Sequence, residues 1–215
     1  MPDATSPELS PLHEPFHTRA RQREADRLGM LVFLASEAML FGGLFAAALM
    51  LRLLDPAAYA AASGRLSFWL GTLNTAVLLT SSALAALAVT AARHGRPRAA
   101  VAMLAGTMAL GALFLAIKGY EWSSEAREGL LPVLAPAHFT SRFEQLFMNL
   151  YLLATGLHAL HVTGGLVLLA TAAFKRRTHE DTEAVLIGNA ALYWHLVDVI
   201  WIFLYPTLYL ARVNA

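Results

Sequence analysis

The chain has 215 residues, of which 57% are hydrophobic and only 14% are charged. Its mean hydropathy of +0.53 is too high for a water-soluble domain of this length, so the composition predicts an integral membrane protein. The lack of cysteine excludes disulfides, iron–sulfur clusters and haem attached through a CxxCH motif. A formal net charge of +1 leaves no concentration of positive charge for nucleic-acid binding.

Five apolar stretches predict an all-α bundle of five transmembrane helices, because a helix needs about 20 apolar residues to cross the hydrocarbon of a membrane. The predicted spans cover residues 28–51, 68–92, 99–117, 147–173 and 190–211, within a membrane domain of residues 28–215. Residues 1–27 are polar and rich in proline. They predict a disordered cytoplasmic lead rather than a secretory signal.

The basic residues predict how the bundle is oriented, since short loops rich in Lys and Arg remain in the cytoplasm. Ten such residues share the face of the amino terminus, against about six on the other face. The amino terminus is therefore expected inside the cell and the carboxyl terminus outside. Aromatic side chains also gather at the predicted outer boundary, where amphipathic rings prefer to lie, namely Tyr59, Trp69, Tyr120, Trp122, Phe143, Tyr205 and Tyr209.

Ionisable side chains inside the predicted spans need a partner or a cavity, because each costs about 2.5–3.5 kcal/mol at the centre of a bilayer. Glu37 lies in the first span, with either a buried structural or lipid-facing role or a role in proton handling. In the fifth span Trp194, Asp198, Trp201 and Tyr205 share one face, and His195 lies beside Asp198. An indole or imidazole donor to the Asp198 carboxylate would give a satisfied buried cluster.

The fourth span carries a stripe of Ala154, His158, His161 and Gly165 on one helix face. Small residues beside two imidazoles indicate a tight helix contact with interhelical hydrogen bonds. Haem or metal ligation is the alternative, but a facing ligand is available only at His195, and no Glu-x-x-His pair projects inward as a di-iron site requires.

Two further stripes of small residues predict helices packed inside the bundle or inside a larger complex. They are Gly71, Asn74, Ser81 and Ala85 in the second span, and Ala102, Gly106 and Ala109 in the third. The segment 119–146 is predicted to lie outside the membrane. Its residues Glu121, Glu125 and Glu128 recur at helical spacing, which is typical of a solvated helix face.

No phosphate-binding loop, nucleophile elbow or HExxH motif is present in the sequence. The residues alone leave three classes of membrane protein open: an accessory subunit, a small solute carrier or a proton-conducting element.

Several segments resemble subunit III of the haem–copper oxidases, and they cover all five spans in order. The two most specific are TGLHALHV and YWHLVDVIWIFLY. The full set comprises GMLVFLASEAMLFGGLF (29–45), LNTAVLLTSS (73–82), KGYEW (118–122), LLATGLHALHVTGGL (152–166) and ALYWHLVDVIWIFLYPTLYL (191–210).

The resemblance implies an accessory subunit without catalytic residues and without haem, copper or another metal of its own. Such a subunit packs against the catalytic subunit I and assembles with subunit II in the cytoplasmic membrane of a bacterium. It supports proton uptake by subunit I. Six positions match family motifs and are implied to be structural, lipid-contacting or hydrogen-bonding, namely Glu37, Glu121, His158, His161, His195 and Asp198.

The resemblance also implies a short, five-span form that lacks the first two of the family's seven spans. The structural phospholipid of the long form lies between those two spans and the rest, so its binding residues do not carry over directly. Two other partners stay open, a quinol oxidase and a nitric oxide reductase, which has similar five-span accessory proteins. An independent proton or solute carrier is the alternative from a different class, based on Glu37 and Asp198.

Overall fold

The structure is a computed structural model, and it describes residues 19–130, 141–174 and 180–211. The described chain is helical and contains no strand. The chain divides into two compact units, and the boundary in the sequence falls between Glu37 and Ala38, within helix α1 (Arg19–Leu54). The second unit continues with α2 (Pro56–Gly64), α3 (Phe68–Arg93), α4 (Pro97–Arg127), α5 (Arg142–Phe174) and α6 (Glu180–Tyr209).

Five of these helices are long and apolar enough to cross a membrane, which confirms the predicted number of spans. They are Leu28–Leu54, Phe68–Arg93, Pro97–Arg127, Arg142–Phe174 and Leu186–Tyr209. α1 begins at Arg19, within the segment expected to be a disordered lead, and residues 1–18 of that segment lie outside the described residues. The predicted orientation of the termini stays a prediction.

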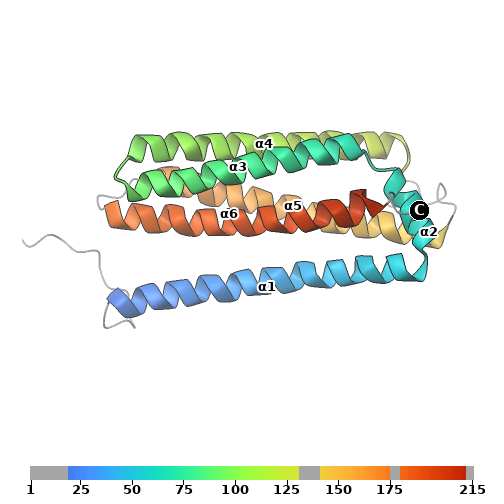
Figure 1. The fold of residues 1–215 in the computed structure, drawn as a ribbon, viewed down its shortest axis with the longest axis horizontal. Coiled ribbons are helices and arrows are strands. Elements are labelled where there is room, and N and C mark those ends of the chain that lie inside the picture. The colour runs from blue at the N-terminus through green and yellow to red at the C-terminus, as the bar shows by residue number, and fades with distance from the viewer. Residues whose placement is uncertain (1–18, 131–140, 175–179, 212–215) are drawn as a thin grey trace, which may run out of the picture. The chain divides into compact units, whose positions relative to one another are not determined.

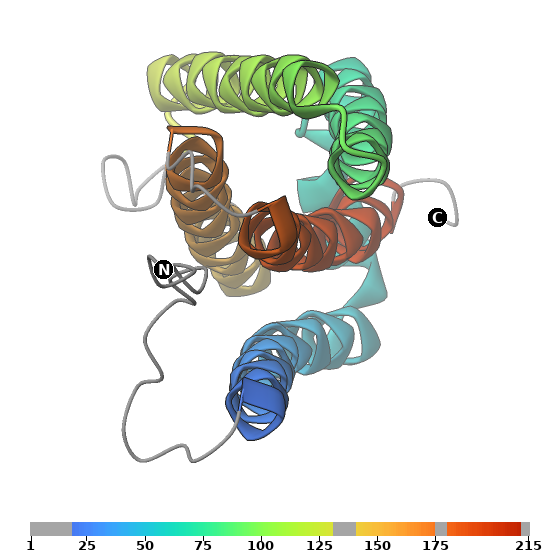
Figure 2. The same cartoon turned by 90° about the vertical axis from the view of Figure 1, so that its left-hand side faces the viewer.

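Helices α3, α4, α5 and α6 run side by side and form a four-helix bundle (Figures 1 and 2). α3 packs against α4 and α6, and α5 packs against the same two helices, so α3 and α5 lie diagonally across the bundle. α3 ends in a tight turn at Gly95, whose φ of +64° favours glycine, and Pro97 then begins α4 at its first turn.

The interior of the bundle is organised by three large side chains of α6, Trp194, Trp201 and Tyr209, each at most 1% exposed. They are seven and eight residues apart, so they lie about two turns from one another on the same face. Close helix approach at these levels depends on glycine. A Cβ added at Gly111 would lie 2.5 Å from the Trp194 ring, and one at Gly165 would lie 2.8 Å from it.

α2 is a short helix in the segment between the first two predicted spans. Asp55 caps its amino terminus by accepting a hydrogen bond from the backbone N–H of Ala58 at 3.0 Å. The buried hydroxyls of Tyr59 and Ser63 donate to the carbonyls of Thr207 (2.9 Å) and Leu208 (2.6 Å). α2 therefore caps the carboxyl end of α6, where the last carbonyls have no partner within the helix.

The two predicted stripes of small residues differ in how deeply they are buried. The α3 stripe of Gly71, Asn74, Ser81 and Ala85 is buried, as predicted. The α4 stripe is not: Ala102 and Ala109 are exposed, and only Gly106 lies against α3, beside Leu84. α4 turns another face inward, because that face carries the residues able to fill the interior, namely Ala100, Leu104, Thr107, Gly111 and Phe114.

We expect Gly111→Ala to destabilise the bundle, because its methyl group would overlap the Trp194 ring. Overpacking of this kind costs about 1–3 kcal/mol. Gly119→Ala is the matched control on the same helix, since nothing lies within 4 Å of its added Cβ. Thermal unfolding of the two variants in detergent measures the difference, and equal midpoints would contradict the packing described.

The phenol of Tyr59 predicts a pH dependence at the α2 end of the bundle. Burial raises its pKa from 10.0 to about 12, against the opposing effect of the Arg52 guanidinium. A raised pKa stabilises the fold fully below pH 10, and this stabilisation is lost as the pH rises through about 12. The free energy of unfolding of Tyr59→Phe should therefore fall less steeply with pH than that of the wild type over this range. Unfolding measured at a series of alkaline pH values tests this. Parallel curves for the two proteins would contradict this prediction.

Candidate functional site

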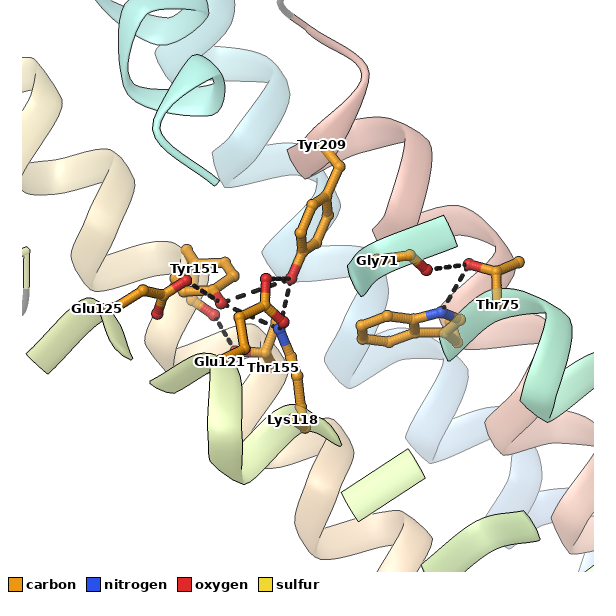
Figure 3. A network of polar contacts seen from close by, with 9 residues as sticks. Gly71, Thr75, Lys118, Glu121, Glu125, Tyr151, Thr155 and Tyr209 are labelled. Carbon is orange, nitrogen blue, oxygen red and sulfur yellow. Dashed lines mark hydrogen bonds and ion pairs between the residues drawn. The ribbon is translucent and has the colours of Figure 1, made fainter. Parts of the chain in front are cut away.

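Five side chains from three helices form a buried polar network near the α2 end of the bundle, here named the ion cluster (Figure 3). They are Lys118, Glu121 and Glu125 on α4, Tyr151 on α5 and Tyr209 on α6. The most exposed of the five, Glu125, has only 5% of its surface exposed. The three charged residues share one face of α4 because they are spaced by three and four positions.

The ammonium of Lys118 is the centre of the ion cluster. It forms an ion pair with Glu121 Oε2 at 2.8 Å. It also donates to the hydroxyl of Tyr151 at 3.0 Å and to the hydroxyl of Tyr209. An ammonium has three N–H donors, so each of them has an acceptor inside the bundle.

The two phenols connect the ammonium to the carboxylates. The Tyr209 hydroxyl donates to Glu121 Oε1 at 2.9 Å, and the Tyr151 hydroxyl donates to Glu125 Oε1 at 2.8 Å. Each hydroxyl thus accepts from the lysine and donates to a carboxylate, which is the full use of a phenol. Charge-assisted bonds of this kind are about twice as strong as neutral ones.

Aromatic faces complete the surroundings of the ammonium. Lys118 Nζ lies 4.7 Å from the ring centroid of Tyr151, 5.1 Å from that of Tyr209 and 5.5 Å from that of Trp201. All three distances are within the range of about 6 Å over which a cation is attracted to a ring face. The ion cluster therefore holds α4, α5 and α6 together through one charge.

The ion cluster was not predicted from hydropathy and spacing, although the resemblance implied a structural or hydrogen-bonding role for Glu121. The predicted third span ended at residue 117, and Glu121 and Glu125 were interpreted as a solvated helix face outside the membrane. That interpretation is wrong, because α4 continues to Arg127 with both side chains buried. Only Glu128 is exposed, as expected. Tyr59 and Tyr209, two of the aromatic residues predicted at the outer boundary, are buried within the chain, and their position in the membrane stays a prediction. The available signal was the spacing of Lys118, Glu121 and Glu125 on one helix stripe.

The tight contact predicted for the α5 stripe is confirmed, since Ala154, His158 and Gly165 are buried and Gly165 faces Trp194. The His158 imidazole is fully buried but has no hydrogen-bond partner among the described residues, so the interhelical bond predicted for it is wrong. Aromatic rings surround it, with centroids at 5.1 Å for Trp201 and 5.5 Å for Phe114.

The α6 face of Trp194, Asp198 and Trp201 is buried as predicted, but its donors are used elsewhere. The indoles donate to hydroxyls of α3, Trp194 to Ser81 and Trp201 to Thr75, each at 3.1 Å. These contacts replace the predicted indole bonds to Asp198, because the rings point across the bundle towards α3. Neither carboxylate oxygen of Asp198 has a hydrogen-bond partner among the described residues, so the satisfied cluster predicted for it is wrong. The Ser82 hydroxyl is instead 2.7 Å from Nδ1 of His195.

Two further predicted residues, His161 and Glu37, are not members of the ion cluster. Nδ1 of His161 is hydrogen-bonded to the Leu157 carbonyl of its own helix at 2.7 Å. Glu37 lies in the candidate span Leu28–Leu54, at the end of the first compact unit, and its role stays a prediction. In the part of the chain that the structure describes, no group of three or more His, Asp or Glu side chains could hold a metal ion.

Comparison with known proteins identifies the family of the chain. Residues 12–212 match the family of cytochrome c oxidase subunit III. The chain belongs to this family. It is 32% identical to a probable cytochrome c oxidase subunit 3 of Nocardia farcinica, covering 86% of this chain and 87% of the relative. It is also 32% identical to cytochrome c oxidase subunit 3 of Thermostichus vulcanus, covering 85% and 86%.

The match also extends to quinol oxidases. A probable quinol oxidase subunit 3 of Staphylococcus aureus is 26% identical, over 90% of this chain and 92% of the relative. The chain is therefore a subunit III of a haem–copper oxidase and a multi-pass membrane protein, in which the ion cluster joins three of the five spans.

We expect Lys118→Met to destabilise this subunit III strongly, because it leaves buried carboxylates without their cation. Breaking one side of a buried ion pair costs about 3–5 kcal/mol, whereas replacing both sides by apolar residues is often tolerated. The double variant Lys118→Met/Glu121→Met should thus recover part of the loss. The thermal midpoint in detergent is the measurement. Arg127→Met, at an exposed position of the same helix, is the control.

If Lys118→Met were as stable as Arg127→Met, the ammonium would not carry the contacts assigned to it. If the double variant were less stable than the single one, the carboxylate of Glu121 would have a stabilising role that does not depend on the lysine.

Proposed function

We propose that this chain is a non-catalytic subunit III of a proton-translocating terminal oxidase in the cytoplasmic membrane of a bacterium. It would pack against subunit I, together with subunit II, and the haem and copper would be held by those partners. The observation that carries the proposal is the family match over residues 12–212, which includes all five candidate spans.

The distribution of polar groups supports an accessory role. In the ion cluster Lys118 is paired with Glu121, and Glu125 accepts a hydrogen bond from Tyr151. The hydroxyls of α3 are paired with indoles and an imidazole of α6. Large apolar side chains point outward instead, including Leu153, Leu160 and Phe203, which are 58–68% exposed. Such surfaces suit lipid or the helices of another membrane subunit.

Cytochrome c is the proposed electron donor of the whole complex. The relatives with 30–32% identity are named cytochrome c oxidase subunits, whereas those named quinol oxidase subunits are 26% identical. Quinol is the second candidate donor, since the quinol oxidase relatives match over 90% of this chain.

Two finer roles belong to the proposal. Glu37, an ionisable side chain within an apolar span, is the residue through which the subunit would support proton uptake by subunit I. A structural phospholipid would bind against the exposed apolar faces of the bundle, where His161 and His195 are the candidate polar contacts.

Affinity capture of the tagged chain from native membranes in mild detergent tests the proposal. We expect the chain to bring down a subunit I with a haem spectrum and cytochrome c oxidase activity, identified by mass spectrometry. Membranes with an untagged chain are the control. Activity with quinol alone would assign the other donor, and a nitric oxide reductase core would assign a different partner class. A colourless chain recovered alone would overturn the proposal and favour an independent carrier.

A further inference from the structure

Two polar side chains in the middle of the bundle are fully buried and lack a hydrogen-bond partner among the described residues. They are Asn74 on α3 and His158 on α5, each with 0% of its surface exposed. Both polar atoms of the Asn74 amide and both ring nitrogens of His158 are affected. Buried polar groups of folded proteins are almost always paired, with protein or with ordered water.

The register of the helices places these two side chains on one level. Trp201 of α6 bonds to Thr75, the neighbour of Asn74, and its ring lies 5.1 Å from that of His158. Phe114 of α4 lies at the same level, 4.8 Å from Trp201 and 5.5 Å from His158. Asn74 belongs to α3 and His158 to α5, and these two helices lie diagonally across the bundle (Figure 2).

The hydroxyls at this level already have partners. The Trp201 indole N–H donates to the Thr75 hydroxyl, which in turn donates to the Gly71 carbonyl of its own helix at 2.8 Å. On the other side, the hydroxyl of Thr155, one turn before His158, donates to the Tyr151 carbonyl at 2.7 Å. The rings of Phe114 and Trp201 lie beside the His158 imidazole and offer it no hydrogen-bonding oxygen.

The chemistry of the unpaired Asn74 amide and His158 imidazole indicates which class of ligand could bind them. The Asn amide group has two N–H donors and one acceptor oxygen, and a neutral imidazole has one donor nitrogen and one acceptor nitrogen. Each side chain therefore needs a partner that can both accept and donate a hydrogen bond. Water supplies both from a single small molecule. Each unpaired polar group in the hydrocarbon region costs several kcal/mol, and proteins hold about one buried water per 27 residues. A larger ligand would have to displace the aromatic rings that pack beside His158.

We propose that the level of Trp201 is a hydrated site, with one ordered water bound to the Asn74 amide and another bound to the His158 imidazole. These waters continue the polar interior of the bundle from the ion cluster, one level closer to α2, to the Ser81–Trp194 pair on the other side. The site belongs to this chain alone, so it does not depend on which oxidase the subunit joins.

Electron cryomicroscopy of the purified native complex, at a resolution that shows ordered water, tests the proposal. We expect a water peak within about 3.2 Å of the Asn74 amide and another within the same distance of a His158 ring nitrogen. Asn74→Leu should lose only the first peak, and His158→Phe only the second. The controls are Asn149→Leu and His94→Phe, at exposed positions, which should keep both peaks.

A wild-type map in which either side chain bonds directly to protein or lipid, with no water beside it, would overturn the proposal. Peaks that persist in both interior variants would also overturn it, because the water would then be held by other groups. The wild-type map is decisive by itself if a variant fails to assemble. The family assignment is tested separately, since it rests on the partners captured with the chain.

Discussion

An ammonium can be buried in a membrane bundle only if each of its three N–H groups has an acceptor, and this requirement ties the helices of the chain together. Lys118 meets it with a carboxylate of its own helix, a phenol of α5 and a phenol of α6. Sliding α6 by one turn, about 5.4 Å, would remove the Tyr209 acceptor and leave an unpaired donor. The cluster therefore selects one register of three helices.

The rest of the α2 end follows from that constraint. Tyr209 is the last residue of α6, where a helix normally frays, yet it must be held in place to accept from Lys118. Tyr59 and Ser63 of α2 bond to the two carbonyls that precede it. Gly71 leaves room for its ring, since an added Cβ would lie 2.9 Å from it. A short helix that sequence patterns did not reveal thus supports the most charged part of the interior.

The features that sequence could predict depend on composition along one helix. The five spans follow from apolar length, and the buried faces of α3, α5 and α6 follow from polar and small residues recurring at helical spacing. The ion cluster could not be found in this way, because hydropathy ends the span just before Lys118 and assigns Glu121 to a loop. Their burial depends on phenols 33 and 91 residues away from the lysine. Ala102 and Ala109 are exposed within this chain, since small size alone does not tell which neighbour a helix face meets.

The buried polar groups of the bundle fall into two sets, those with a hydrogen-bond partner in the chain and those without one. Groups bonded across helices, such as Ser81 with Trp194, are satisfied by the chain itself and need nothing further for folding. Asn74 and His158 need a molecule from outside the chain, so the native bundle would include its waters as part of the packed interior. Replacing either residue by an apolar one removes both the unpaired polar group and its water. The change in the free energy of unfolding then depends on how well the new side chain fits the space. Intramembrane polar residues of an accessory subunit can therefore serve the fold directly, without any role in transport.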